Sequence, residues 1–211
     1  ANAYDAAAYA AQKFKWFAFS LTGMYRYQFA KDWDGDHFTE TPELQRYYVA
    51  PQLYFDIGKH ARLNIGGNYT HENRTGGTVE FIKGEADTTY SYFERNLSDH
   101  ASGNVKFEYD FEQYGKLTVK NATNYFNRDL KIPYYYFRGK QLATASELNY
   151  RLVRKRHDVV VGVDVRTDKF DEGVDSSVLS RSYSFITVGA FVQYIYNFDE
   201  KTTIEGGLRV D

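Results

Sequence analysis

Several residue types are scarce in this sequence of 211 residues, which has no cysteine, three prolines and one methionine. The absence of cysteine excludes disulfides, thiolate metal sites and a cysteine nucleophile. The formal net charge is −2, so the chain has no basic surplus of the kind that binds nucleic acid. Because no run of about 18 apolar residues is present, the sequence also excludes a transmembrane helix.

Aromatic residues, by contrast, are abundant, with 20 tyrosines, 16 phenylalanines and 2 tryptophans. Such a surplus is typical of long strands whose ends lie at lipid interfaces, where aromatic side chains form girdles. The mean hydropathy is −0.60. That value does not exclude a transmembrane barrel, because alternation of apolar and polar residues hides the apolar face from an average.

The clearest strand pattern lies in residues 184–211. Apolar side chains or glycine occupy every second position over 192–198 and again over 204–210, with polar residues 199–201 between the two runs. Gln193, Glu205 and other polar side chains fall on the opposite face. This period of two predicts an antiparallel hairpin with one apolar face and one polar face.

The same alternation recurs along the chain and predicts about nine strands. Short turns are expected near residues 59, 114, 155 and 199, with long polar loops between them. Long loops on one rim and tight turns on the other are typical of an outer-membrane barrel. Besides the closing hairpin, the alternating runs cover 17–29, 47–57, 63–70, 104–111, 117–125, 142–152 and 159–165, and the long loops cover 32–44, 71–100, 128–140 and 171–181.

The predicted fold class is all-β, an antiparallel up-and-down transmembrane β-barrel, of which residues 13–211 form a part. Residues 1–12 are weakly patterned and fit either a short helix or the frayed end of a strand. Because bacterial barrels have an even number of strands, about nine strands predict a fragment. A soluble β-sandwich is the other interpretation, and it predicts that 159–165 packs against 117–125.

Several segments resemble one family of bacterial proteins. Residues 189–211, GAFVQYIYNFDEKTTIEGGLRVD, combine a Gly-aromatic-x-Gln strand, a short turn and a Gly-Leu-Arg-x-Asp strand. This arrangement is similar to a mid-barrel hairpin of TonB-dependent outer-membrane receptors. Residues 32–44, 51–77 and 92–111 resemble the same family as it occurs in Bacteroidetes, so the resemblance spans nearly all of the chain.

The resemblance implies a barrel of about 22 strands in the bacterial outer membrane, closed by an N-terminal plug and energised through TonB. It also implies import of a scarce nutrient complex, with a ferric siderophore or a cobalamin-like molecule as the expected substrate. The expected partners are the lipid bilayer, the plug domain, the remaining barrel strands and TonB through the parent protein. We expect the plug and the C-terminal strands to lie outside this chain. A passive porin or an adhesin-like barrel is the alternative function.

An acidic segment, residues 32–36 (DWDGD), is the strongest candidate for a metal site. Together with Glu43 it copies the carboxylate spacing of a calcium loop, and Ca²⁺ prefers several oxygen ligands. However, His37 stands where that pattern has glycine. We therefore expect no required cofactor, and either a solvated acidic loop tip or a Ca²⁺ site with these ligands: Asp32, Asp34, Asp36 and Glu43.

Two aromatic segments are candidates for ligand binding. Flat rings can stack on a planar chelate, and an arginine can bind an anionic group on it. The alternative interpretation is aromatic packing at the membrane rim. The candidate residues are Tyr90, Tyr92 and Arg95 in one long loop and Tyr134, Tyr135, Tyr136, Phe137 and Arg138 in the next.

No enzyme activity is expected. The sequence has no Gly-x-Ser-x-Gly motif and no phosphate-binding glycine loop, and no stretch places a general acid, a base and a nucleophile together. The five histidines are scattered without ligand spacing, which does not favour haem or zinc. Charged residues on the predicted polar face, such as Lys106, Glu147 and Arg209, suit a wet or plugged lumen.

Overall fold

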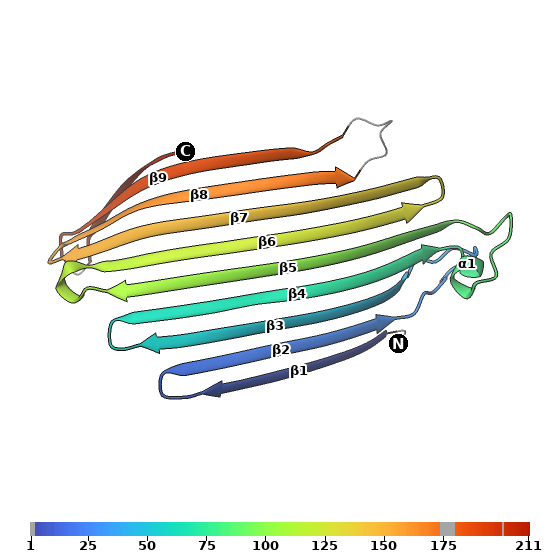
Figure 1. The fold of residues 1–211 in the computed structure, drawn as a ribbon, viewed down its shortest axis with the longest axis horizontal. Helices are drawn as coiled ribbons and strands as arrows, with labels where there is room; N and C mark the ends of the chain where they lie inside the picture. The colour runs from blue at the N-terminus through green and yellow to red at the C-terminus, as the bar shows by residue number, and fades with distance from the viewer. Residues whose placement is uncertain (1–2, 174–179, 200) are drawn as a thin grey trace.

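The computed structural model describes residues 3–173, 180–199 and 201–211, and these form one ten-stranded antiparallel sheet (Figure 1). Each strand pairs with its neighbours in sequence, so the sheet is an up-and-down meander. Its elements are β1 (Ala3–Lys13), β2 (Phe17–Gln28), β3 (Glu43–Ile57), β4 (Ala61–Gly77), α1 (Val79–Lys83), β5 (Phe93–Asp110), the 3₁₀ turn η1 (Glu112–Tyr114), β6 (Lys116–Ile132), β7 (Tyr135–Arg154), β8 (His157–Gly173), β9 (Tyr183–Asn197) and β10 (Thr203–Val210).

The predicted fold class is confirmed, with ten strands in place of about nine. The additional strand is β1, which pairs with β2 from Ala3 opposite Gln28 to Lys13 opposite Ala18. Its alanines lie on both faces, so the segment shows no apolar alternation although its backbone pairs like any other strand. In the described part of the chain, no helix is both long and apolar enough to cross a membrane.

The register gives the sheet two chemically different faces. One row across four strands consists of Phe19, Leu53, Ile65 and Val105, and it belongs to what we call the apolar face. Rows of the opposite surface, the polar face, lie between the apolar rows. One of these contains Asn64, Lys106, Lys120, Glu147 and Asp164.

The apolar face has no second layer packed against it in the described residues. Among all the described residues, only Leu44 and Ala61 are buried apolar residues, and Val163 on the apolar face is 48% exposed. The β-sandwich interpretation is wrong, because 159–165 and 117–125 lie on the same sheet and contribute to the same face. So large an apolar surface requires a non-aqueous environment or a partner.

The predicted hairpin near the C-terminus is confirmed. Val192 lies opposite Leu208 and Tyr196 opposite Ile204, both on the apolar face. The Asp199 carboxylate accepts hydrogen bonds from the amides of Lys201 and Thr202, each at 2.8 Å. This side-chain acceptor fixes the turn, as aspartate commonly does at such positions.

Two predicted long loops are shorter than expected. The predicted loop 71–100 is reduced to 78–92, because β4 continues to Gly77 and β5 begins at Phe93. The predicted loop 128–140 is wrong: β6 and β7 continue to a connection of two residues, 133–134. Near this end the alternation changes faces: Asn127, Asp129 and Lys131 lie on the apolar-face side of β6, whereas Phe126, Leu130 and Ile132 lie on the polar face. The apolar pattern of the preceding residues is therefore interrupted while backbone pairing continues. Of the predicted loop 171–181, residues 174–179 lie outside the described residues.

A charged network crosses β9 on the polar face where Gly189 has no side chain. Arg209 Nη2 on β10 donates to Asp164 Oδ1 on β8 at 3.0 Å, and Arg209 Nε donates to Asp211 at 2.7 Å. Arg166 Nε lies 3.3 Å from the same Asp164 oxygen. The Asp164 side chain is only 6% exposed, and these guanidinium groups are its ion-pair partners.

We predict that Gly189→Ala destabilises the protein by about 1–2 kcal/mol, because its Cβ would lie 2.3 Å from Asp211 Oδ1 and 2.8 Å from Asp164 Oδ2. Gly206→Ala on β10 is the matched control, since its Cβ meets nothing within 4 Å. Urea unfolding followed by tryptophan fluorescence measures both variants. Equal stability of the two variants would contradict this role of Gly189.

Candidate functional site

The described connections 29–42, 78–92 and 133–134 leave the sheet at one edge, which we call the loop rim (Figure 1). The short turns lie at the opposite edge, the turn rim. The loop rim also carries α1 and the eight aromatic or arginine residues proposed from the sequence as ligand-binding candidates. A candidate functional site is therefore sought at this rim and on the polar face below it.

The connections 29–42 and 78–92 are docked on each other. The Thr39 hydroxyl donates to the Gly77 carbonyl at 2.9 Å, and Thr39 is 7% exposed. The amide of Val79 donates to the His37 carbonyl at 3.0 Å. His37 Nδ1 lies 2.6 Å from Glu80 Oε1, and this hydrogen bond lowers the pKa of the Glu80 carboxyl. The two connections thus form one structured unit above the sheet.

Tyr90 and Tyr92 belong to this unit. The Tyr90 ring stacks on His37 with centroids 4.8 Å apart, and Tyr92 packs against Phe38 at 5.5 Å. Both tyrosines therefore join the two connections, a structural role that the sequence did not reveal.

The acidic cluster in the first connection consists of Asp32, Asp34, Asp36 and Glu40, whose carboxylate oxygens lie within 4.8 Å of one another. Glu43, the fourth ligand expected from the sequence, is outside this cluster and begins β3. The cause is a local fold-back: Lys31 and Thr41 form an antiparallel bridge, which returns Glu40 towards the aspartates. A calcium-loop spacing, taken from a helix–loop–helix unit, does not anticipate this bridge.

Much of the cluster's hydrogen-bonding capacity is used by the loop itself. Asp32 accepts the amides of Gly35 at 2.7 Å and His37 at 3.0 Å, and the Gly35 bond is the main cause of a lowered Asp32 pKa. For Asp34, the amide of Asp36 lowers the pKa, but partial desolvation and the neighbouring carboxylates outweigh it and raise the pKa overall. The like charges repel, which is the electrostatic condition that a bound cation relieves.

If Ca²⁺ binds at this loop, the structure makes Glu40, and not Glu43, its fourth carboxylate ligand. We predict that Tb³⁺ bound at this loop is sensitised by Trp33, that Ca²⁺ displaces it, and that Glu40→Gln weakens binding while Glu43→Gln does not. Luminescence titration of the full-length protein measures this. Equal Tb³⁺ affinities of the two variants would show that Glu40 is not the fourth ligand.

The candidates 134–138 are divided between the two faces. Tyr134 is at the tip of the connection and fully exposed, with φ of 65°. Tyr135 and Phe137 lie on the polar-face side of β7, whereas Tyr136 and Arg138 lie on the other side. Strand alternation causes this split, since successive side chains of a strand point to opposite faces. The five residues cannot contact one ligand together.

Arg95 and Arg138 both lie on the side continuous with the apolar face. Arg138 Nε donates to Asp129 Oδ1 at 2.8 Å, and Arg95 lies on β5 opposite Lys131 of β6. Neither guanidinium is therefore directed to the polar face.

A group of aromatic residues that the sequence analysis missed lies on the polar face beneath the loop rim. The rings of Phe137 and Phe170 meet above Gly139, where an added Cβ would lie 2.8 Å from each. Phe170 stacks on Tyr183 at 5.6 Å, and Tyr183 contacts Phe185 at 5.0 Å. We call Phe137, Phe170, Tyr183 and Phe185 the aromatic shelf.

A cation and two hollows adjoin the aromatic shelf. The Arg181 guanidinium lies 5.4 Å from the Phe137 ring centroid and pairs with Glu172. Gln141 Nε2 donates to the Tyr183 hydroxyl at 3.2 Å, and Gln141 also lines a hollow of about 410 Å³ with His100. His100 in turn lines a second hollow of about 620 Å³, which contains Arg26, Arg46, Tyr48 and Glu72.

A signal for the aromatic shelf exists in the sequence. Phe170 lies on the same face of its strand as Asp168 and Glu172, so it is an aromatic residue in a series of positions that are otherwise polar. Phe185 is in the same situation in β9. Aromatic residues at polar-face positions next to a loop are the observation that could have indicated this group.

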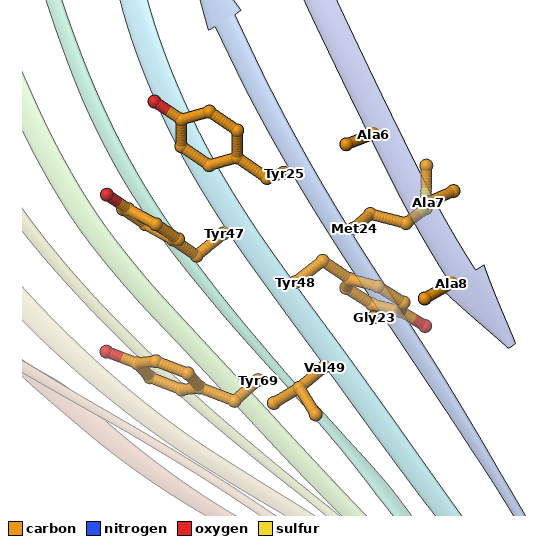
Figure 2. A pocket seen from close by; sticks show the side chains of 10 residues that line it. All are labelled: Ala6, Ala7, Ala8, Gly23, Met24, Tyr25, Tyr47, Tyr48, Val49 and Tyr69. Atoms are coloured by element: carbon orange, nitrogen blue, oxygen red, sulfur yellow. The ribbon is translucent and has the colours of Figure 1, made fainter. Parts of the chain in front are cut away.

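The apolar face has a groove of its own, shown in Figure 2. It measures about 480 Å³ and lies where Ala6, Ala8 and Gly23 leave space beside Tyr25 and Tyr47. The lining is almost entirely apolar and the groove is open. It is a shallow gap in the apolar surface, and no charged side chain lines it.

Comparison with known proteins gives a fold likeness only. No protein-family model matches the chain, and no curated protein is similar to it in sequence. Among solved structures, the copper transporter OprC superposes with a TM-score of 0.71 at 12% identity, covering 98% of this chain and 35% of that chain. The ferric-catecholate import receptor Fiu from E. coli K12 gives 0.68 at 13%, covering 97% and 43%.

A third similar structure is the RagAB peptide transporter, with a TM-score of 0.65 at 11% identity, covering 98% of this chain and 31% of that one. At these identities the likeness establishes the fold of the chain alone, an up-and-down antiparallel sheet of ten strands that superposes on part of each of these chains. The chain spans between 31% and 43% of the three solved chains.

Proposed function

We propose that this chain is the barrel portion of a TonB-dependent receptor of the bacterial outer membrane, which imports a scarce nutrient complex. In this proposal the apolar face contacts lipid, the polar face lines the lumen and the loop rim is extracellular. The observation that carries it is the single sheet whose exposed apolar face runs unbroken across ten paired strands. A lipid environment is the medium in which that face is stable.

The fold likeness supports a transport role without selecting a substrate. The similar structures are described as a copper transporter, a ferric-catecholate import receptor and a peptide transporter. Assignment to the Bacteroidetes type of receptor rests on the sequence motifs alone. The bilayer, the plug, the remaining strands and TonB are the partners that this proposal requires.

The aromatic shelf supports a ferric siderophore with planar aromatic groups as the substrate. Ring faces at stacking distance suit an aryl chelate. Arg181 lies beside Phe137, but its charge is already paired with Glu172. The two hollows at His100 continue this surface along the polar face. Binding would begin at the shelf, and passage along the lumen would follow rearrangement of the plug. A cobalamin-like molecule is the second substrate of this proposal.

If the apolar face contacts lipid, introducing a charged side chain there should destabilise the protein more than introducing one on the polar face. Val163→Arg on the apolar face should destabilise the protein in lipid vesicles by about 2–4 kcal/mol, because a cation there would be held in hydrocarbon. Ala122→Arg on the polar face is the matched control and should change stability by less than about 1 kcal/mol. Unfolding by urea in vesicles measures both, and equal costs would contradict the assignment of the faces.

The proposed substrate site predicts a difference between two neighbouring residues. Phe137→Ala combined with Phe170→Ala should weaken binding of ferric enterobactin about tenfold or more, since two stacking surfaces are lost. Tyr136→Ala, one position away on the other face, should leave it unchanged. Fluorescence quenching of the full-length protein measures the affinities, with cyanocobalamin as the second ligand.

Failure of both ligands to bind would refute this choice of substrates. Uptake that persists in cells without TonB would favour the passive porin instead of the receptor.

A further inference from the structure

The apolar face changes its chemistry before it reaches the loop rim. Tyr69, Tyr125 and Leu142 form the last predominantly apolar row on β4, β6 and β7. In the next three rows towards the loop rim, the same face of β4 to β8 carries mostly charged and polar side chains. These are His71, Asn73, Thr75, Arg95, Leu97, Asp99, Asn127, Asp129, Lys131, Tyr136, Arg138, Lys140 and Asp171.

The carboxylates in this region already have partners. Asp129 pairs with Arg138 at 2.8 Å, and Asp171 lies 3.1 Å from Lys169 Nζ. Asp99 accepts the Tyr69 hydroxyl at 2.6 Å and lies 2.8 Å from His71 Nδ1. On β4 to β8, no carboxylate of these rows is left to neutralise a further cation, and the next carboxylate in the row of Arg95 is Glu43 on β3, beyond Thr75.

Three basic side chains remain without a carboxylate partner among the described residues. They are Arg95, Lys131 and Lys140, which we call the basic strip, and all three are exposed. Arg95 and Lys131 lie directly opposite each other on β5 and β6. Like charges in that arrangement destabilise a sheet, so an anion placed between them would stabilise this one.

The basic strip extends along the surface between the apolar band and the loop rim. Lys140 lies two rows nearer the band than Lys131, a distance of about 13 Å along the strands. The basic strip could therefore contact anionic groups at different distances from the apolar band at the same time.

The turn rim differs in where its charge lies. At that end the same face carries an uncharged row of Ile57, Ala61, Tyr109, Leu117 and Tyr150. Beyond that row β7 continues on this face to Arg154, which precedes Lys155 and Arg156 of the turn. Basic residues therefore occur at both rims, and under the proposed function those of the loop rim lie on the side of the outer leaflet. Clustered Lys and Arg beside an apolar band are complementary to anionic headgroups.

We propose that the basic strip binds the phosphate-bearing headgroup of an anionic outer-leaflet lipid, whose acyl chains lie on the apolar face below. This inference rests on the proposed function, because it requires the apolar face to contact lipid. The Tyr69 and Tyr125 rings at the boundary fit the interface between acyl chains and headgroups.

The test compares two double variants of the full-length protein in detergent micelles containing bis-phosphorylated lipid A. Arg95→Gln with Lys131→Gln should weaken lipid binding about 25-fold, since each basic side chain contributes about fivefold near an anionic surface. Arg74→Gln with Arg128→Gln removes the same charge near the same height on the polar face and should leave binding unchanged. Native mass spectrometry measures the bound lipid, and circular dichroism confirms that each variant is folded.

Dephosphorylated lipid A should bind the wild-type protein as weakly as the phosphorylated form binds the Arg95/Lys131 variant. Unchanged affinity in that variant, or an equal loss in the control, would overturn the proposal. Displacement of the lipid by inorganic phosphate at matched ionic strength would show a simple phosphate site and overturn the lipid assignment. Ferric enterobactin binding, measured separately, reports on the proposed function, so failure of one test is distinguishable from failure of the other.

Discussion

The antiparallel register between neighbouring strands is the constraint on which the rest of this structure depends. A slip of one residue in any pair would move the side chains of one strand to the opposite face. The alignment of β3 with β4 is kept even at Pro51, which has no amide hydrogen to donate. Pairing resumes at Gln52 opposite Gly66 in the same register. Ten strands in this register produce an apolar surface and a polar surface that extend across all the strands, and the apolar surface becomes charged and polar only in the rows nearest the loop rim.

A single sheet of this kind has almost no interior of its own. Cross-strand backbone hydrogen bonds satisfy the peptide groups, while side-chain stabilisation depends on what covers each face. Charged groups on the polar face are held by cross-strand networks such as that of Asp164 and Arg209. Under the proposed function, lipid covers one surface, and water or a plug covers the other.

The loop rim combines two surfaces because each strand contributes to both. Phe137 and Arg138 are adjacent in sequence, yet one belongs to the aromatic shelf and the other pairs with Asp129 on the opposite side. Under the proposed function, substitutions one residue apart would therefore separate substrate contact from lipid contact. The docked connections above the sheet, joined through Thr39 and Glu80, form a third element with its own acidic cluster.

The sequence by itself determined the fold class, the apolar parity and the positions of the tight turns, because a period of two is visible within each strand. It did not reveal β1, whose alanines give no contrast between faces, or the full length of β6 and β7, where polar and apolar residues exchange faces near the loop rim. Only the tertiary structure decided that Glu40 rather than Glu43 joins the aspartates and that Phe170 and Tyr183 lie beside Phe137. Those neighbours come from different strands or from a folded-back connection, and such contacts are set by register between segments that are distant in sequence.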